Sequence, residues 1–442
     1  MSSRIDWDLG DERLNARGDI CLDTLTENPS APFPKVFEDD ADLEGFYRFL
    51  HNSKTTPQAL FESIRTQSWE RARDFRDALV LHDTTEINPI SKSIREFNRL
   101  SGFRAHVSLL VHSTGQDVFG PVGLKLMTRP ARQQGRWLEF VEEAEKCAPE
   151  NVNLLHVMDS EADSSDIWHA LQQNKRRFVI RARYSRQAKT KSGKPSLLFD
   201  EIEKAPVLGG RNIWVSKRKG SVYPARRASH VSRDQKVIHL KVSAQRIRVN
   251  LTKLIGKCHH DSGQTAEINV VRAFEKLNAS TGRDKVDWIL LTSEPIGSLE
   301  EVFNVIDIYR HRWLVEEYFK ALKTGCQLEK RLLADKKSWW SLTSLMMPIA
   351  TTLLNLRLRL DLRMSQASFL ISAVQMKILK IKAKEHGYKF KTYSDAQAVI
   401  AKLGGHIKWN GPPGWITLLR GYLELRLLEQ GWLLAQKERC DK

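Results

Sequence analysis

The sequence predicts a mixed α/β protein in which an α/β core is interrupted by a strand-rich insertion and flanked by helical modules. Three patterns lead to this expectation. Short apolar runs alternate with helical segments over 132–182 and again over 286–323, which is typical of α/β folds. Strand-and-turn patterns with scattered glycines fill 184–284, and both ends of the chain are mostly helical.

The length of 442 residues, about three times a usual domain of roughly 150, predicts more than one compact unit. We expect five regions. They are an N-terminal helical domain, the first part of the core, a β-rich insertion, the second part of the core, and a C-terminal helical domain, over 1–75, 76–184, 185–285, 286–364 and 365–442.

The first elements follow from local signals. Thr56-Pro57 is an N-cap followed by a proline at the first helical position, which predicts a helix that continues through Trp69. Three short β-rich runs come next and predict neighbouring antiparallel strands, at 78–83, 105–111 and 118–127.

The core then alternates between helix and strand. We expect a helix over 132–147, a strand over 154–158, a helix over 166–173 and a strand over 178–182. After the insertion, a strand over 286–292 and one long helix over 298–323 resume the pattern. The uncharged stretch 338–356 contains Pro348 and several Ser and Thr residues, so it predicts a buried core helix rather than a membrane span.

The composition indicates a globular protein with a polyanionic partner. Hydrophobic residues make up 41% and charged residues 28%, a balance that excludes disordered and fibrous chains. The net charge of +17 favours nucleic acid or an acidic membrane surface as the partner. Five scattered cysteines indicate a reducing compartment, and the N-terminus has no export signal, so we expect a cytoplasmic location.

The positive charge is concentrated in one window. Residues 174–233 contain seventeen Lys or Arg and three acids, among them Arg226 and Arg227, with Trp214 and Tyr223 interleaved. This mixture suits phosphate contacts and base stacking, so we expect DNA or RNA to bind here rather than a merely solvated face. A second basic stretch, 376–391, is weaker evidence, because it is also typical of an ordinary lysine-rich helix face.

Two aspartates stand where a metal site could form. Asp83 follows one apolar strand run and Asp159 follows another, and a carboxylate at a strand end projects beside the sheet edge. Taken singly, each is better explained as a turn or N-cap aspartate than as a metal ligand.

The long helix predicted over 298–323 supplies a third carboxylate. At 100° per residue, Tyr309, Arg312, Glu316 and Lys323 fall within an arc of about 60°, while Glu317 falls outside it. Surface ion pairing between Arg312 and Glu316 is the alternative. Two carboxylates at strand ends and one on a helix can hold a pair of Mg²⁺ ions for phosphodiester chemistry. Arg312 and Lys323 would then hold the DNA strand, and Tyr309 could donate to a phosphate oxygen.

These motifs resemble a known family. The helix 307–317, continuing to Lys323-Thr324-Gly325, is similar to the Tyr-Arg-Glu-Lys signature of bacterial cut-and-paste transposases with an Asp-Asp-Glu triad, the "IS-four" insertion-sequence family and within it the "Tn-five" type. His82-Asp83-Thr84-Thr85 and Asp159-Ser160-Glu161-Ala162-Asp163 resemble its two aspartate motifs. Further similarities lie at 9–13, 44–49, 224–228, 403–405 and 414–415, so the resemblance covers nearly the whole chain.

The resemblance implies an RNase H-like catalytic core interrupted by a β insertion, an N-terminal domain that recognises double-stranded transposon ends, and a C-terminal domain for homodimerisation in a synaptic complex. It implies excision through nicking and a hairpin intermediate, followed by strand transfer into target DNA. Asp83, Asp159 and Glu316 would bind Mg²⁺, for which Mn²⁺ can substitute. Trp288 would stack a base flipped out at the hairpin, whereas from sequence alone a tryptophan at this position is more often a core residue. The family commonly has Arg where this chain has Ser160.

Other interpretations compete with this one. Cys258-His259-His260-Asp261 could suggest zinc, but adjacent ligands rarely share one tetrahedral ion. A catalytically silent transposase relic acting as a DNA-binding regulator would keep end binding without cleavage. An RNase H-like recombination nuclease would cut without regard to terminal sequence.

Overall fold

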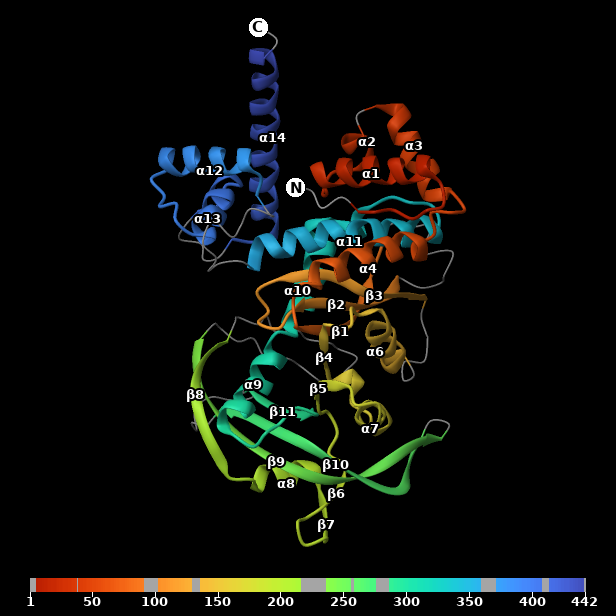
Figure 1. Cartoon of the computed structure of the whole chain (residues 1–442), viewed down its shortest axis with the longest axis vertical. Helices are drawn as coiled ribbons and strands as arrows, with labels where there is room; N and C mark the ends of the chain where they lie inside the picture. The colour runs from red at the N-terminus through yellow and green to blue at the C-terminus, as the bar shows by residue number, and fades with distance from the viewer. Residues whose placement is uncertain are drawn as a thin grey trace. The chain divides into compact units, whose positions relative to one another are not determined.

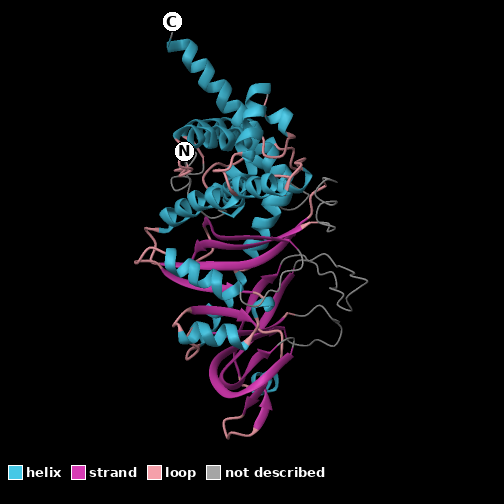
Figure 2. Ribbon diagram, turned by 90° about the vertical axis from the view of Figure 1, so that its right-hand side faces the viewer, coloured by secondary structure: helices cyan, strands magenta, loops and turns pink. Residues whose placement is uncertain are grey.

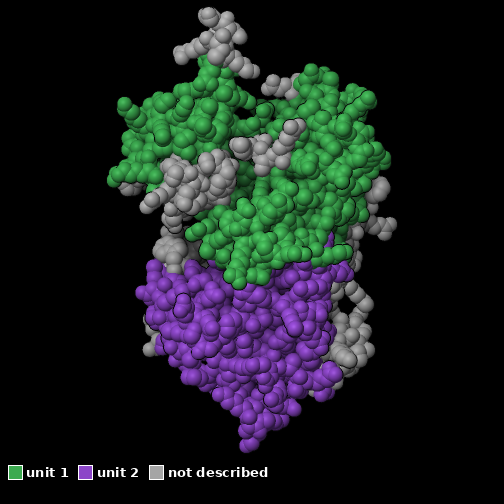
Figure 3. All heavy atoms as spheres, viewed as in Figure 1, with its two compact units in different colours: residues 1–132, 146–153, 313–442 green, residues 133–145, 154–312 purple. Residues whose placement is uncertain are grey.

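The computed structural model describes residues 5–37, 39–90, 102–128, 136–215, 236–255, 258–275, 286–358, 371–407 and 413–440. The chain forms two compact units (Figure 3). Unit 1 comprises residues 1–132, 146–153 and 313–442, and unit 2 comprises 133–145 and 154–312. Unit 1 is therefore assembled from three separate stretches of chain.

Unit 1 begins with four helices, as expected for a helical N-terminus. They are α1 (Glu12–Glu27), α2 (Phe33–Val36), α3 (Asp40–His51) and α4 (Pro57–Ala72). The hydroxyl of Thr56 accepts a hydrogen bond from the Ala59 N–H at 3.1 Å, and Pro57 occupies the first turn. The predicted helix start at Thr56-Pro57 is thereby confirmed.

A three-stranded antiparallel sheet follows in unit 1, in the order β3-β2-β1, which confirms the three predicted strands. The strands are β1 (Asp77–Ile87), β2 (Phe103–His112) and β3 (Val118–Thr128). Helix α4 packs on β3, and a Cβ at Gly120 would lie 2.3 Å from the Ser68 hydroxyl oxygen. Gly120 also has φ +143°, so both backbone conformation and helix proximity call for glycine there.

Helix α11 (Lys336–Leu358) forms the core of unit 1 and confirms the buried helix expected over 338–356. Most of its residues are buried, and it packs against α1, α3, α4 and β3. Its polar side chains have local partners: the hydroxyls of Ser341 and Ser344 donate to the carbonyls of Thr55 and Pro57, each at 3.1 Å. Among the described residues, no helix is long and apolar enough to cross a membrane.

A buried arginine joins the N-terminal helices to the segment before α11. Arg331 is 3% exposed, and its guanidinium donates to the carbonyls of Pro29, Ala31 and Cys326 while lying over the Phe33 ring. Burial lowers the pKa of Arg331 to about 10. The charge is held by oxygen dipoles of the backbone, which ties residues 29–33 to residues 326–331.

The C-terminal part of unit 1 is helical, as expected, with α12 (Ala373–Glu385), α13 (Tyr393–Leu403) and α14 (Trp415–Cys440) packing on one another (Figure 1). Two glycines set the approach of α13 to α14. A Cβ at Gly421 would lie 1.6 Å from the Ile400 carbonyl oxygen, and one at Gly404 would lie 1.9 Å from the Thr417 carbonyl oxygen. Any side chain at either position would separate the two helices.

Unit 2 is built on a mixed sheet. Strand β4 (Asn153–Met158) pairs in parallel with β5 (Arg177–Arg181), and the order continues antiparallel through β11 (Asp287–Thr292), β10 (Cys258–Glu275) and β9 (Lys236–Ile255). β9 and β10 form a long, curved hairpin (Figures 1 and 2). The remaining strands flank β9: β6 (Gln187–Lys189), β7 (Pro195–Leu197) and β8 (Val207–Val215).

Helices α6 (Arg136–Cys147), α7 (Ser165–Gln173) and α8 (Leu198–Lys204) supply the apolar side chains that complete the core of unit 2. Trp137, Trp168 and Phe178 are among its fully buried members. The predicted alternation of helix and strand over 136–181 and the strand-rich stretch after it are confirmed. Helix α8 lies within a stretch that the sequence predicts as strands and turns.

The prediction of a single long helix over 298–323 is wrong. The chain forms α9 (Leu299–Arg310), turns at His311 and Arg312, forms α10 (Trp313–Lys320), and ends in a π-helical turn, Ala321–Gly325. At the turn, the Arg312 N–H bonds to the Tyr309 carbonyl at 3.0 Å, three residues back instead of four. The polar stripe derived from one continuous helix is therefore not formed as predicted.

We expect Gly421→Ala to destabilise the C-terminal helices, because its methyl group would overlap a backbone oxygen of α13. Overpacking of this kind typically costs about 1–3 kcal/mol. Gly431→Ala is the matched control on the same helix, since its Cβ would meet nothing within 4 Å. It should stabilise α14 by up to about 1 kcal/mol. Thermal unfolding of both variants checks this, and equal melting temperatures would contradict it.

Candidate functional site

Asp83 lies near the middle of β1, opposite Val107 of β2, and is partly exposed. The prediction that Asp83 ends its strand is wrong, because β1 stays paired with β2 as far as Ile87. The Asp83 carboxylate accepts the N–H of Thr84 at 2.8 Å. The neighbouring side chains point to the other face of the sheet. There His82 bonds to Ser108 at 2.9 Å, and Thr84 bonds to His106 at 3.0 Å. The strand that carries Asp83 is thus fixed from its opposite face.

Glu316 lies in the first turn of α10, which packs on β1 within unit 1. Its side chain is exposed, whereas the adjacent Glu317 is 7% exposed. Glu317 accepts from the indole N–H of Trp415 at 3.2 Å and forms ion pairs with Lys320 at 2.6 Å and Arg357 at 3.2 Å. Of the two adjacent acids, Glu317 joins α10 to α11 and α14, and Glu316 faces solvent.

Lys323 lies in the π-helical turn that follows α10. Its ammonium donates to the Glu86 carbonyl at the end of β1 and lies 4.0 Å from a carboxylate oxygen of Glu329. Burial lowers the pKa of Lys323, and Glu329 opposes that shift. Glu329 also accepts the N–H groups of Asn88 and Ile90, each at 2.9 Å, through its side chain and its carbonyl respectively. This clamp holds the end of β1 against the segment that continues from the Glu316 helix.

Asp159 follows β4 in unit 2 and is partly exposed. Its carboxylate accepts the N–H of Glu161 at 2.8 Å, so it caps the short 3₁₀ helix Ser160–Ala162. That turn is anchored by Asp163, whose side chain is fully buried. Asp163 forms an ion pair with Arg186 and accepts the N–H groups of Arg183 and Tyr184 at 2.6 and 3.0 Å.

The three carboxylates predicted to bind metal offer oxygen ligands, the type that hard divalent cations prefer. Asp83 and Glu316 belong to unit 1 and Asp159 belongs to unit 2. Among the described side chains, no group of three or more His, Cys, Asp or Glu residues is arranged to hold a metal ion. The shared metal site of Asp83, Asp159 and Glu316 therefore stays a prediction.

The other predicted site residues on α9 and β11 lie in unit 2. Tyr309 is 5% exposed, and Trp288 is partly buried. Their rings meet at 5.6 Å between centroids with an interplanar angle of 66°. Arg312 occupies the turn between α9 and α10 and is partly exposed. Trp288 thus has an aromatic neighbour within the fold.

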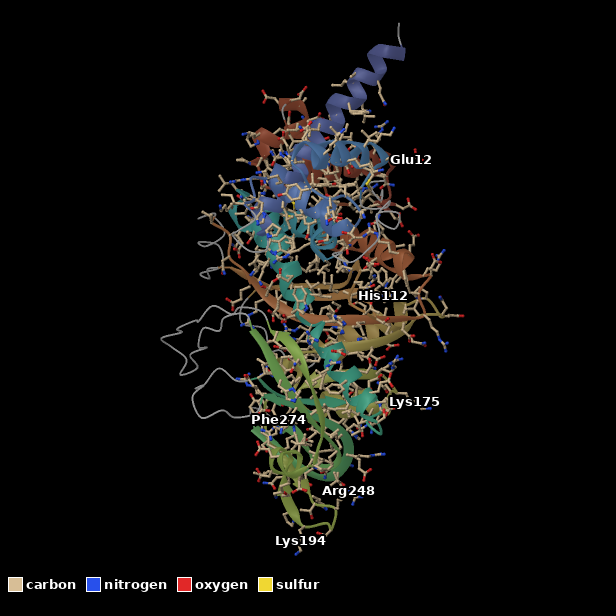
Figure 4. The ribbon with its side chains drawn as sticks, turned by 90° about the vertical axis from the view of Figure 1, so that its left-hand side faces the viewer. Glu12, His112, Lys175, Lys194, Arg248 and Phe274 are labelled. Atoms are coloured by element: carbon tan, nitrogen blue, oxygen red, sulfur yellow. The ribbon has the colours of Figure 1, made fainter. Side chains whose placement is uncertain are left out.

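Part of the positive charge in the described part of the window, residues 174–215, is already paired. Five of its cations form ion pairs with acids: Arg176 with Glu142 and Glu145, Arg177 with Glu294, Arg186 with Asp163, Lys204 with Glu201, and Arg211 with Asp307. Lys175 and Lys194, by contrast, are exposed on unit 2 (Figure 4). Arg226 and Arg227 lie outside the described residues, as do the side chains of Cys258, His259, His260 and Asp261.

Three residues that sequence reasoning did not single out for a role hold the predicted site residues in place. Glu317 fixes the helix that carries Glu316, and Glu329 fixes the end of β1. Asp163 fixes the turn after Asp159. Asp163 belongs to the motif Asp159–Asp163, so the sequence could have indicated its role. The sequence contains no signal for the role of Glu329, because its partners Asn88 and Ile90 lie more than 200 residues earlier in the chain.

Comparison with known families identifies two parts of the chain. Residues 5–55 match the family "Transposase DNA-binding", and residues 137–341 match the family "Transposase DDE domain". The chain thus contains one region that matches a transposase DNA-binding domain and another that matches a transposase DDE domain. DNA is accordingly its partner, and enzymes of this class generally use divalent metal ions.

The DDE domain match contains Asp159, Glu316, Trp288, Tyr309 and the turn that carries Lys323, whereas Asp83 lies before it. Among solved structures, the chain is similar to one described as a "piggyBac transposase synaptic complex with hairpin DNA". The sequence identity is 10% and the TM-score 0.34, over 88% of this chain and 71% of that chain.

We expect the two adjacent acids of the DDE domain to differ in their effect on stability. Glu317→Ala removes a buried partner of Trp415, Lys320 and Arg357 and should cost about 1–3 kcal/mol. Glu316→Ala changes an exposed side chain and should stay within about 0.5 kcal/mol of the wild type. Urea unfolding measures both. A larger loss for Glu316→Ala than for Glu317→Ala would refute the assignment of Glu317 as the structural acid.

Proposed function

We propose that this protein is a cut-and-paste transposase of the "IS-four" family that binds the terminal inverted repeats of an element, excises it and joins its 3′ ends to target DNA. The observation that carries the proposal is the presence of a transposase DNA-binding domain and a DDE domain in one chain. The two motifs that resemble the second aspartate and the Tyr-Arg-Glu-Lys signature both fall within the DDE match.

The division of labour follows from the two domains. The N-terminal helices over residues 5–55 recognise the element's ends, and the DDE domain carries out phosphoryl transfer. The catalytic part is an RNase H-like core, and the strands β6–β10 form an insertion in it. Parallel β4 and β5 with antiparallel neighbours support this proposal, because a mixed sheet with helices is the architecture such a core requires.

Asp83, Asp159 and Glu316 would hold the metal ions in this proposal. Mg²⁺, or Mn²⁺ in its place, would activate the attacking oxygen and stabilise the leaving oxygen of the phosphodiester. The exposure of Glu316 and the partial exposure of Asp83 and Asp159 leave these carboxylates accessible to solvent. Glu317 is unsuited to the role, because its carboxylate is buried and already bound to three partners.

The remaining residues would hold DNA. Arg312 and Lys323 would bind phosphate oxygens as cations, and Tyr309 would donate from its hydroxyl. To reach a phosphate, Lys323 must exchange its bond to the Glu86 carbonyl for the new one. In a hairpin intermediate the terminal base leaves the stack, and Trp288 would offer it an aromatic surface. Arg226 and Arg227 would contact the backbone of the transposon end.

Joining two ends requires two copies of the protein, so we propose a homodimer formed through residues 365–442. Exposed apolar side chains along α14 support this role, since such side chains favour burial against a partner. Leu427 is 62% exposed and Leu434 is 64% exposed. They lie seven residues apart, on one face of the helix.

We expect Mg²⁺-dependent cleavage at the ends of a cognate element, abolished by Asp83→Ala or Glu316→Ala with DNA binding retained. Each substitution removes a carboxylate ligand while leaving residues 5–55 unchanged. Glu300→Gln is the control, because Glu300 is an exposed acid at the start of α9 that we assign to no metal. Cleavage of labelled end duplexes on denaturing gels, with band shifts for binding, measures both properties.

Cleavage that persists in both alanine variants would refute the metal assignment. End binding by the wild type with no cleavage in either Mg²⁺ or Mn²⁺ would identify a silent relic that acts as a regulator. Cleavage of branched or hybrid substrates regardless of terminal sequence would identify a recombination nuclease instead.

A further inference from the structure

A row of unpaired lysines runs along one face of α12 in the C-terminal part of unit 1. Lys377, Lys380 and Lys384 are all exposed. At 100° per residue they fall within an arc of about 60°. Lys389 and Lys391, in the connection to α13, are exposed as well. Among the described residues, none of these five lysines has a carboxylate within 4 Å.

The acids near this row are engaged elsewhere. Glu385 forms an ion pair with Lys382 at 2.9 Å, away from the row. Glu429 of α14 accepts hydrogen bonds from Ser372 and from the Gln375 amide at the start of α12. Asp395 accepts the N–H groups of Lys391 and Thr392, each at 2.8 Å, where it caps α13, and it also interacts electrostatically with Lys389.

This face contrasts with the basic window 174–233, in which five cations are paired with acids. Of the six lysines in the stretch 376–391, Lys382 alone forms an ion pair with an acid among the described residues. The apolar side of α12, with Ile378, Leu379 and Ala383, is buried against α13 and α14, so the lysine face is presented by a fixed helix.

The row has the dimensions of a duplex backbone contact. Lys377 and Lys384 are seven residues apart, or about 10 Å along the helix axis. A DNA duplex carries about six phosphate charges over that length. Long ammonium side chains on such a row can reach several phosphates without any base contact, which favours binding that is independent of sequence.

We propose that α12 and the connection after it bind the phosphate backbone of duplex DNA without reading its sequence. The partner is DNA because this is a chain with a transposase DNA-binding domain and a DDE domain, and because its lysine row complements a regularly spaced polyanion. None of these lysines belongs to residues 5–55 or to the residues assigned above to metal or DNA. The inference rests on the proposed function only in the choice of DNA as the polyanion.

The test compares the full-length triple variant Lys377→Gln/Lys380→Gln/Lys384→Gln with the wild type. Binding to a random-sequence duplex is measured by fluorescence anisotropy between about 50 and 200 mM salt. Each lost phosphate contact lowers the salt slope by about 0.9, so the slope should fall by two to three units and affinity by at least tenfold near 0.1 M salt. Glutamine removes the charge while keeping an unbranched polar side chain of similar helix propensity.

Lys382→Gln is the matched control, because Lys382 lies on the same helix but is paired with Glu385. It should leave the slope unchanged, and thermal unfolding should show that both variants are folded. An unchanged slope in the triple variant would overturn the proposal. The proposal would also be overturned if the triple variant lost binding to anionic phospholipid vesicles or to an acidic peptide but not to DNA. Since no cleavage is measured, the outcome is independent of whether the metal assignment holds.

Discussion

Unit 1 depends on the burial of α11. A helix that is apolar on nearly all sides must be enclosed, and here the N-terminal helices and β3 enclose it. Asn355 of α11 completes the edge of β3: its amide accepts the Val118 N–H at 2.9 Å and donates to the Val118 carbonyl at 2.7 Å. A side-chain amide thereby satisfies backbone groups that an edge strand would otherwise leave unpaired. Through this packing, the helices of the DNA-binding domain and the strand that carries Asp83 share one core.

The elements that could be predicted from sequence were those with strong local signals. Alternating apolar residues located β1, β2 and β3, and Thr56-Pro57 located the start of α4. The turn at His311 and Arg312 could not be predicted, because the stretch 299–324 contains no proline or glycine to interrupt a helix. Tertiary packing decided it, as it also decided that Gly404 and Gly421 would be contact points between helices.

The partners of charged side chains could not be predicted from the sequence either. Counting cations along the sequence located a basic window but could not reveal partners such as Glu294 for Arg177, which lies 117 residues away. The helical positions distinguished Glu316 from Glu317 as the candidate functional acid, but they did not predict that Glu317 is buried. The predicted alignment of Tyr309 with Glu316 required one continuous helix, so the turn at His311 and Arg312 removes it.

The assembly of unit 1 from three separate stretches of chain has a consequence for synthesis. Arg331 holds residues 29–33, Glu329 holds the end of β1, and Asn355 holds β3, so each of these N-terminal segments needs a partner made more than 200 residues later. On a ribosome, residues 133–145 and 154–312 can complete their own core while the first 132 residues still lack α11. Chains that stop before α11 would leave the apolar surface of the DNA-binding helices uncovered, which makes such fragments prone to aggregation rather than competitors for DNA ends.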